Sequence, residues 1–436
     1  MSAFPDTECV VTGTLSMMLR MSQIAGVAPL SFRRTHGGWY IRTSRAANCY
    51  GKALSFCLWF LSSFTIAIDI LIQPERSFRT RTNSTRIVWL ADVATVAIVV
   101  CAAAFTGISR MRCLTVYALK LEEINLRLSL FHEEPSNEAN RRLIAVSSMI
   151  FVVSTILVDY SIFIYQVITE HGKIVTSCMY IFYNISTIVQ QVILVTFSET
   201  VTSVLTSLQM LNNCLKNLLQ EILDSSELTN CALNYDSYIN MHPNRSAIPN
   251  KSINSVVDTM AVYKGYRKSS IKAVPSTIRR LALLYCSICD VIRLVNDSHG
   301  LILVALMLCL LLHLVITPYH VITNICEFIN KERSDRSSPL LQLNWAVLHF
   351  VNLLLIVEPC HRTHEEMEQT RHLISQMIRY TPSEHGVLLT ELQMFYQHLI
   401  LNEVSYAPLK MFSLNRSLIV TILGSITTYL VVVVQL

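Results

Sequence analysis

The C-terminal segment of the chain, residues 417–436, is apolar except for small and polar residues that recur at helical spacing. These residues share one helical face, and Ile and Val occupy the opposite positions. The face is formed by Ser417, Thr421, Gly424, Ser425, Thr428 and Gln435. Around an oligomer axis it would line a pore, with Val431 or Val432 as an apolar ring and Gln435 at the outer end. Small and hydroxylated residues also mediate ordinary packing between membrane helices, and the spacing alone favours packing over a pore.

A second group of residues could bind a small polar molecule. Aromatic and hydrogen-bonding side chains gather near one end of five apolar segments. The candidates are Trp89, Asp92, Asp159, Tyr160, Tyr183, Thr317, His320, Gln342, Trp345 and His349. Aromatic plates beside hydrogen-bonding groups suit a small polar ligand with apolar faces, a sugar among them. Trp and Tyr also anchor helices at membrane interfaces, and for any single aromatic residue that interpretation is favoured.

Ionisable residues inside apolar segments are more informative, because a charge in lipid is costly and such groups face a cavity or a partner. Asp92, Asp159 and His313 are of this kind. We expect at least one of the two aspartates to face the ligand pocket.

The remaining reactive residues do not predict an enzyme. Cys286 and Cys289 form a C-x-x-C on a helical pattern, with no second pair nearby. His361 and His364 precede two glutamates, and a solvated helix start is favoured over a metal site there. The sequence shows no nucleophile–base arrangement and no phosphate-binding loop. We therefore expect no catalysis, no metal and no cofactor.

Membrane helices must position these residues. Of the 436 residues, 52% are hydrophobic and 15% charged, against about 25% charged in soluble domains. Apolar runs of about 20 residues match the thickness of a bilayer and must be helical there. The predicted spans are Ala53–Ile72, Ile87–Ile108, Leu143–Tyr165, Ile174–Phe197, Leu301–Ile322, Leu340–Val357 and Ser417–Gln435. The net charge of +5, without a basic stripe, gives no reason to expect a nucleic-acid partner.

Charge asymmetry predicts the orientation of these spans. About three quarters of the 35 Lys and Arg residues lie in the N-terminal tail and in the loops 109–142, 198–300 and 358–416. Cytoplasmic segments carry such an excess, so the N-terminus is expected inside and the C-terminus outside. This topology, and the absence of Asp-Arg-Tyr after the third span, disfavour a G-protein-coupled receptor.

Three spans are predicted to continue as amphipathic helices into the cytoplasm. Apolar residues recur at helical spacing from Val201 to Ile222, from Leu281 to Val295 and from Met367 to Ile378. These stripes must be buried, most simply against one another. The segment Asp224–Ser255 is rich in Asn, Ser, Asp and Pro, and it is interpreted as a flexible linker.

The end of the chain resembles a known signature. Thr428-Tyr429, five apolar residues and Gln435 resemble the C-terminal Thr-Tyr, five hydrophobic residues and Gln-Phe of insect gustatory receptors, with Leu436 in place of the final Phe. Residues 357–361 (Val-Glu-Pro-Cys-His) and 412–416 (Phe-Ser-Leu-Asn-Arg) also look like this family.

The resemblance implies a homotetrameric or heterotetrameric cation channel in the plasma membrane, opened by a small-molecule tastant from outside. The last span would line the pore, and the cytoplasmic helices would anchor the subunits to each other. The implied pore and gate residues are Thr421, Ser425, Thr428, Val432, Gln435 and Leu436. Three alternatives stay open, namely a G-protein-coupled receptor, an odorant-type receptor and a secondary transporter, although neither internal repeats nor broken helices support the last.

The fold prediction is an all-α polytopic membrane protein with seven spans. Its parts are a cytoplasmic N-terminal segment (1–52), four spans (53–197), cytoplasmic helices with the linker (198–300), two spans (301–357), anchor helices (358–416) and the pore-lining span (417–436).

Overall fold

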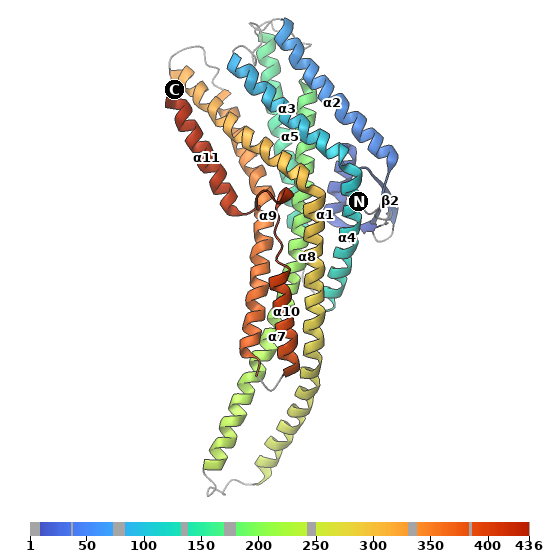
Figure 1. The fold of residues 1–436 in the computed structure, drawn as a ribbon, viewed down its shortest axis with the longest axis vertical. Helices are drawn as coiled ribbons and strands as arrows, with labels where there is room; N and C mark the ends of the chain where they lie inside the picture. Colours follow the sequence, from blue (N-terminus) through green and yellow to red (C-terminus); the bar gives the residue numbers. More distant parts are fainter. Residues whose placement is uncertain are drawn as a thin grey trace.

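The computed structural model describes residues 9–35, 38–72, 83–131, 138–169, 180–241, 250–329, 338–382 and 386–435. Helices dominate, and most run along one long axis (Figure 1). The long helices are α2 (Arg45–Ile72), α3 (Asn83–Phe105), α4 (Gly107–Ser129), α5 (Glu138–Thr169), α7 (Ile181–Met241), α8 (Asn250–Ile329), α9 (Ser338–Tyr380) and α11 (Arg416–Gln435). The shorter ones are α1 (Gly13–Ile24), α10 (Gly386–Leu401) and a 3₁₀ turn, η2 (Pro408–Lys410).

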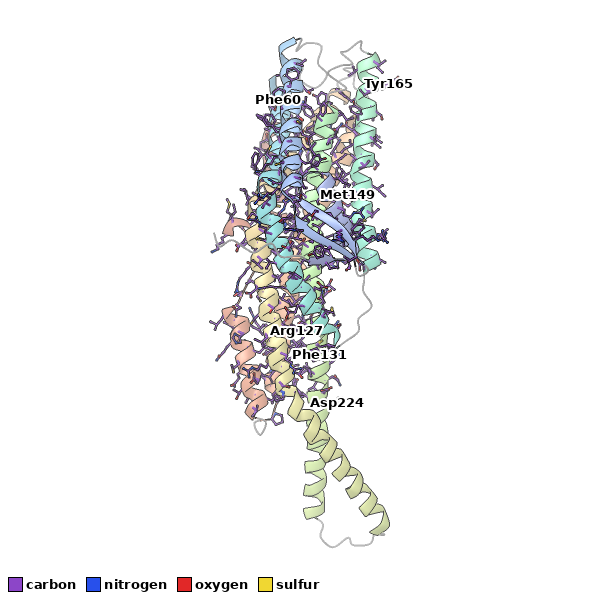
Figure 2. All side chains as sticks on the ribbon, turned by 90° about the vertical axis from the view of Figure 1, so that its right-hand side faces the viewer. Phe60, Arg127, Phe131, Met149, Tyr165 and Asp224 are labelled. Carbon is purple, nitrogen blue, oxygen red and sulfur yellow. The ribbon has the colours of Figure 1, made fainter. Side chains whose placement is uncertain are left out.

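The upper half of the molecule in Figure 1 has the character of a membrane domain. Within the described residues, α5, α7, α8 and α9 contain segments long and apolar enough to cross a bilayer. Helices α3 and α4 would add a fifth as a broken span, and α11 is a shorter apolar helix. Large apolar side chains point outward here, among them Phe60 on α2 and Tyr165 on α5 (Figure 2). Such exposure is expected where lipid rather than water is the solvent.

The second span ends earlier than predicted. Helix α3 stops at Phe105, and α4 leaves it at an angle of 61°. Gly107 begins α4, and a Cβ there would lie 3.1 Å from the Pro29 ring. The N-terminal segment therefore packs closely against the chain at the bend between α3 and α4.

The lower half is a bundle built from the continuations of α7, α8 and α9, with α10 packed against α8 and α9. The predicted stripes form its core, because Leu208, Leu215, Ile288, Val295 and Ile374 are all buried. The expectation that three spans continue as long helices with buried apolar stripes is thus confirmed.

The helices reach further than predicted into the segment Asp224–Ser255. Helix α7 continues to Met241 and α8 begins at Asn250, while residues 242–249 lie outside the described part. Polar composition weakened the sequence signal for helix here, but polar residues do not prevent a helix from continuing along a solvated face. The described residues of this segment are therefore helical, where the sequence suggested a linker.

A small sheet adds to the predicted all-α fold. Strands β1 (Cys9–Val11), β2 (Leu30–Thr35) and β3 (Gly38–Thr43) form an antiparallel sheet in the order β1-β3-β2. The buried sheet face includes Cys9, Leu30 and Ile41, and β1 and β3 contact α4. The sheet lies at the lower end of α2, at the boundary between the two halves (Figure 1).

Candidate functional site

A buried acid–base pair links two spans in the upper half. Asp92 on α3 and His313 on α8 are both buried, and His313 Nε2 pairs with Asp92 Oδ1. A carboxylate only accepts hydrogen bonds, so Nε2 carries the proton of this contact. Tyr183 on α7 donates its hydroxyl to Asp92 Oδ2 at 2.7 Å. Asp92 and His313, two of the three ionisable groups that the sequence places in apolar segments, are therefore paired with each other, as groups buried in a membrane require.

Ring stacking extends this site onto α9. The His313 and His349 rings stack with centroids 4.3 Å apart and an interplanar angle of 12°. Trp345, one turn before His349, stacks on the His349 ring at 5.7 Å. The helical spacing of four between Trp345 and His349 places both rings on one face of α9.

Aromatic residues close the other side of the Asp92 pair. The Trp89 ring lies 5.1 Å from that of Tyr183 and 5.3 Å from that of Tyr180. Phe163 on α5 contacts Tyr180 edge to face at 4.9 Å, and Tyr160 packs against the same cluster. The site is thus built from α3, α5, α7, α8 and α9, and we call it the polar–aromatic cluster.

Most of the predicted pocket residues meet in this cluster. It contains Trp89, Asp92, Tyr160, Tyr183, Trp345 and His349. Thr317 is buried on α8 one turn from His313, and Gln342 is half-buried on α9 one turn before Trp345. Asp159 is half-buried on α5 beside Tyr160 in the chain. The side chain of His320 lies outside the described residues.

Sequence reasoning missed three members of the site. Phe163 belongs to the cluster, and Cys309 contacts His313 Nδ1 at 3.4 Å. Gln190 on α7 lies 3.5 Å from Cys309. Helical spacing could have identified two of them, because Cys309 lies one turn before His313 and Gln190 lies two turns after Tyr183, on the same helix faces.

Polar contacts below the cluster join α9 to its neighbours. The Gln191 amide on α7 donates to Asn352 at 3.0 Å and to Ser148 on α5 at 2.9 Å. Nearer the N-terminal end of α9, the Asn344 amide donates to the Thr155 hydroxyl on α5 at 2.9 Å. Hydrogen bonds between membrane helices fix their relative rotation, so α9 is held on both sides of His349.

The foot of α11 is fastened to α9 just beyond the predicted sixth span. Arg416 donates two hydrogen bonds to the Glu358 carboxylate, at 2.7 and 3.1 Å. Arg362 donates a third at 2.8 Å. The hydrogen bonds from Arg416 lower the pKa of Glu358 to about 2, aided by those from Arg362. The two family-like segments, 357–361 and 412–416, therefore meet in one bidentate ion pair.

The polar stripe of α11 points away from its own subunit. Ile422 and Ile426, on the opposite face, are 9% and 6% exposed and belong to the core. Thr421, Ser425 and Thr428 are exposed, and their hydroxyls bond to carbonyls of the same helix at 2.9 Å. A Cβ at Gly424 would meet nothing within 4 Å. Packing of the stripe within the subunit is thus excluded for these residues; the side chains of Val432 and Gln435, and Leu436 as a whole, lie outside the described part.

The comparison with known families covers almost the whole chain. A sequence profile of the 7tm chemosensory receptor family matches residues 15–436. The chain belongs to this family.

Two individual relatives agree with that assignment. A 200-residue segment is 26% identical to the Drosophila melanogaster gustatory receptor for sugar taste 43a, and it covers 44% of this chain and 45% of that relative. The match thus spans less than half of the relative's length. The fold resembles the insect olfactory receptor OR5 from Machilis hrabei, with a TM-score of 0.58 and 10% identity over 97% of this chain and 96% of that one. The profile match confirms the predicted chemoreceptor family, and the structural match confirms the predicted fold.

Members of this chemoreceptor family are ligand-gated ion channels rather than enzymes. Within the described residues, no three His, Cys, Asp or Glu side chains are grouped to hold a metal ion.

Proposed function

We propose that this receptor is one subunit of a tetrameric cation channel of the plasma membrane, opened by a tastant from outside. The orientation of α11 carries the proposal. Its apolar face is committed to the core of its own subunit, while its hydroxyl face is left for water or for symmetry mates. A ring of such faces offers hydroxyl oxygens and no basic side chain, which suits cations.

The polar–aromatic cluster is the proposed tastant site, and a sugar is the first class to test. Carboxylate, imidazole and phenol groups can exchange hydrogen bonds with ligand hydroxyls, and the Trp rings offer apolar plates. The relative named for sugar taste supports this choice. Because His313, His349 and Trp345 stack on one another, a ligand that enters between these rings has to separate them.

Helix α9 is the proposed link between ligand and pore. It carries Trp345 and His349 in the cluster and Glu358 at the foot of α11. His349 and Glu358 are nine residues apart, or about 13 Å along a helix. Pro359 lies inside α9 and cannot donate a helical hydrogen bond, so α9 can bend there. A ligand that binds better when α9 is displaced would pull on α11 and favour the open state.

The proposed orientation puts the N-terminus in the cytoplasm and the C-terminus outside. The excess of Lys and Arg on the side of the sheet and the helical bundle supports it. Epitope tags at the two termini, stained with and without permeabilisation, test it directly. An N-terminal tag that stains on intact cells would overturn the orientation and revive a G-protein-coupled receptor.

Cysteine accessibility tests the pore. We would express Ser425→Cys and Thr428→Cys in cells without taste receptors, record whole-cell current under a sugar panel, and add a charged thiol reagent during activation. Both variants are expected to lose current irreversibly. Leu423→Cys, exposed on the far side of α11, is the matched control and should be unaffected. Equal loss at all three positions, or none at Ser425 and Thr428, would overturn a pore lined by this stripe.

A further inference from the structure

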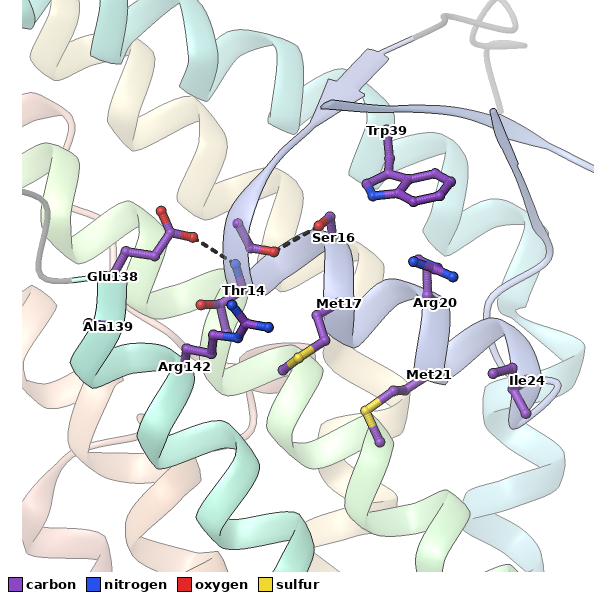
Figure 3. Close-up of a pocket in the computed structure, with 11 residues that line it drawn as sticks. Thr14, Ser16, Met17, Arg20, Met21, Ile24, Trp39, Glu138, Ala139 and Arg142 are labelled. Atoms are coloured by element: carbon purple, nitrogen blue, oxygen red, sulfur yellow. Dashed lines mark hydrogen bonds between the residues drawn. The ribbon is translucent and has the colours of Figure 1, made fainter. Parts of the chain in front are cut away.

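A cavity of about 670 Å³ lies between the N-terminal elements and the first turn of α5 (Figure 3). Helix α1 lines one side, Trp39 of β3 closes one end, and Glu138, Ala139 and Arg142 of α5 form the other side. It is separate from the polar–aromatic cluster and from α11.

Two guanidinium groups reach this cavity. Arg20 lies over the Trp39 ring at 4.3 Å from its centroid, which fixes the Arg20 side chain. Arg142 extends from α5 toward the first turn of α1 (Figure 3). In the described part of the chain neither arginine forms an ion pair with a carboxylate. Glu138 also lines the cavity, but its Oε1 accepts the Thr14 backbone N–H at 2.7 Å and so caps α1.

A buried hydroxyl in the same wall has no partner. Thr14 is 2% exposed, and its Oγ1 makes no hydrogen bond to the described residues. Leaving a buried polar group unsatisfied is unfavourable, so Thr14 gains from a ligand that accepts a hydrogen bond. Two guanidinium groups and a hydroxyl donor together match the oxygens of a phosphate.

The other walls of the cavity are apolar and lead toward the bilayer. Met17, Met21 and Ile24 follow one another along α1, and Ile24 is 73% exposed. Leu143, directly after Arg142, begins the predicted third span and is 67% exposed. A ligand with a phosphate at the arginines can therefore place an apolar chain on these side chains and continue into lipid.

The surroundings are strongly basic. Arg34 pairs in register with Trp39 and Arg33 with Tyr40, and both arginines are exposed. Basic residues immediately cytoplasmic of a span attract the negatively charged headgroups of anionic lipids.

We propose that this cavity binds the phosphate headgroup of an anionic phospholipid of the cytoplasmic leaflet, held by Arg20, Arg142 and Thr14. The lipid joins α1 and the sheet to the base of α5. The assignment to that leaflet rests on the proposed orientation, whereas headgroup binding rests on neither the orientation nor ion conduction.

Native mass spectrometry of the purified full chain in detergent tests the proposal without any channel measurement. The probes are short-chain phosphatidylinositol bisphosphate and phosphatidylserine, with phosphatidylcholine as the neutral comparison. Binding of the anionic lipids is expected to weaken about tenfold in Arg20→Gln and in Arg142→Gln, since each loses a charge-assisted contact. Arg280→Gln, the same change at an exposed position on α8 away from the membrane, should bind like the unchanged protein.

Two further arms make the result decisive. Melting temperatures without lipid identify a variant that is misfolded, and Arg20→Lys and Arg142→Lys, which keep the charge, should bind with intermediate strength. Inositol trisphosphate that binds as tightly as the lipid would make the ligand a soluble phosphate and overturn the lipid assignment. Equal binding by the folded Gln variants and by Arg280→Gln, or equal binding of phosphatidylcholine, would overturn the site.

Discussion

Replacing Asp92 tests whether its carboxylate holds the polar–aromatic cluster together. In Asp92→Ala, the buried His313 Nε2–H and the half-buried Tyr183 hydroxyl lose their shared acceptor. Each unsatisfied group costs about 1–3 kcal/mol, so we expect a loss of about 4 kcal/mol in the free energy of unfolding.

Asp92→Asn should cost much less. Its amide oxygen can still accept from Tyr183, and its NH₂ can donate to Nε2 of a neutral His313 whose proton has moved to Nδ1. That nitrogen then faces Cys309 Sγ at 3.4 Å, a weak acceptor. Only the additional strength of hydrogen bonds to a charged carboxylate is lost, which lowers the free energy of unfolding by about 1 kcal/mol.

The first assay is thermal or denaturant-induced unfolding of the purified variants, all in the same detergent. The second is the sugar concentration that gives half-maximal current in cells that express each variant. Tyr183→Phe removes one of the two donors without changing the ring, and it should fall between Asn and Ala. A double-mutant cycle between Asp92→Ala and Tyr183→Phe isolates their coupling, because each change removes the hydrogen bond between the two side chains. Asn and Ala variants with the same stability, or an Ala variant as stable as the unchanged protein, would refute the reasoning.

Further changes probe the scaffold. Arg416→Gln should reduce the maximal current because α11 loses its bidentate contact with Glu358, and the exchange Glu358→Arg with Arg416→Glu should restore part of it. Since the pKa of Glu358 is lowered to about 2, the Arg416–Glu358 pair contributes fully to stability above pH of about 4.5 and is lost only toward pH 2. This pair should therefore cause no difference between the currents recorded at cytoplasmic pH 8 and at pH 5.5. Phe395→Ala, at a fully buried ring 5.9 Å from that of Tyr285, should lower the free energy of unfolding by about 3–5 kcal/mol, measured by denaturant unfolding. Gly13→Ala should lower the melting temperature, because φ is +65° and the new Cβ would overlap the Glu138 carboxylate.

Controls separate these effects from general damage. Lys410→Gln changes a cation close to Arg416 in the chain that forms no ion pair with the described residues, and it should leave the current intact. Unchanged current in Arg416→Gln would mean that the ion pair does not couple α9 to α11. Gly386→Ala meets nothing within 4 Å, so a melting temperature lowered as much as in Gly13→Ala would contradict the steric argument.

Much of the helical scaffold was predictable because its causes are local. A run of apolar residues must be helical in lipid, and periodic residues such as Leu208 and Ile288 show which face of a helix is buried wherever it packs. The N-terminal sheet was missed because β1 has three residues and pairs across a gap with β3, Cys9 with Ile41. Strands so short carry too few alternations to be recognised before their partners are known.

For the site, sequence determined the candidates and tertiary structure decided their arrangement. The cost of charge in lipid singled out Asp92 and His313 without reference to any neighbour. Their pairing joins residues 221 positions apart, and the Arg416–Glu358 pair joins residues 58 apart. No local pattern encodes such contacts, because they depend on how each helix is rotated and which helices are adjacent. The same holds for α11: its periodicity defines a polar face, but only the burial of Ile422 and Ile426 against the subunit turns that face outward.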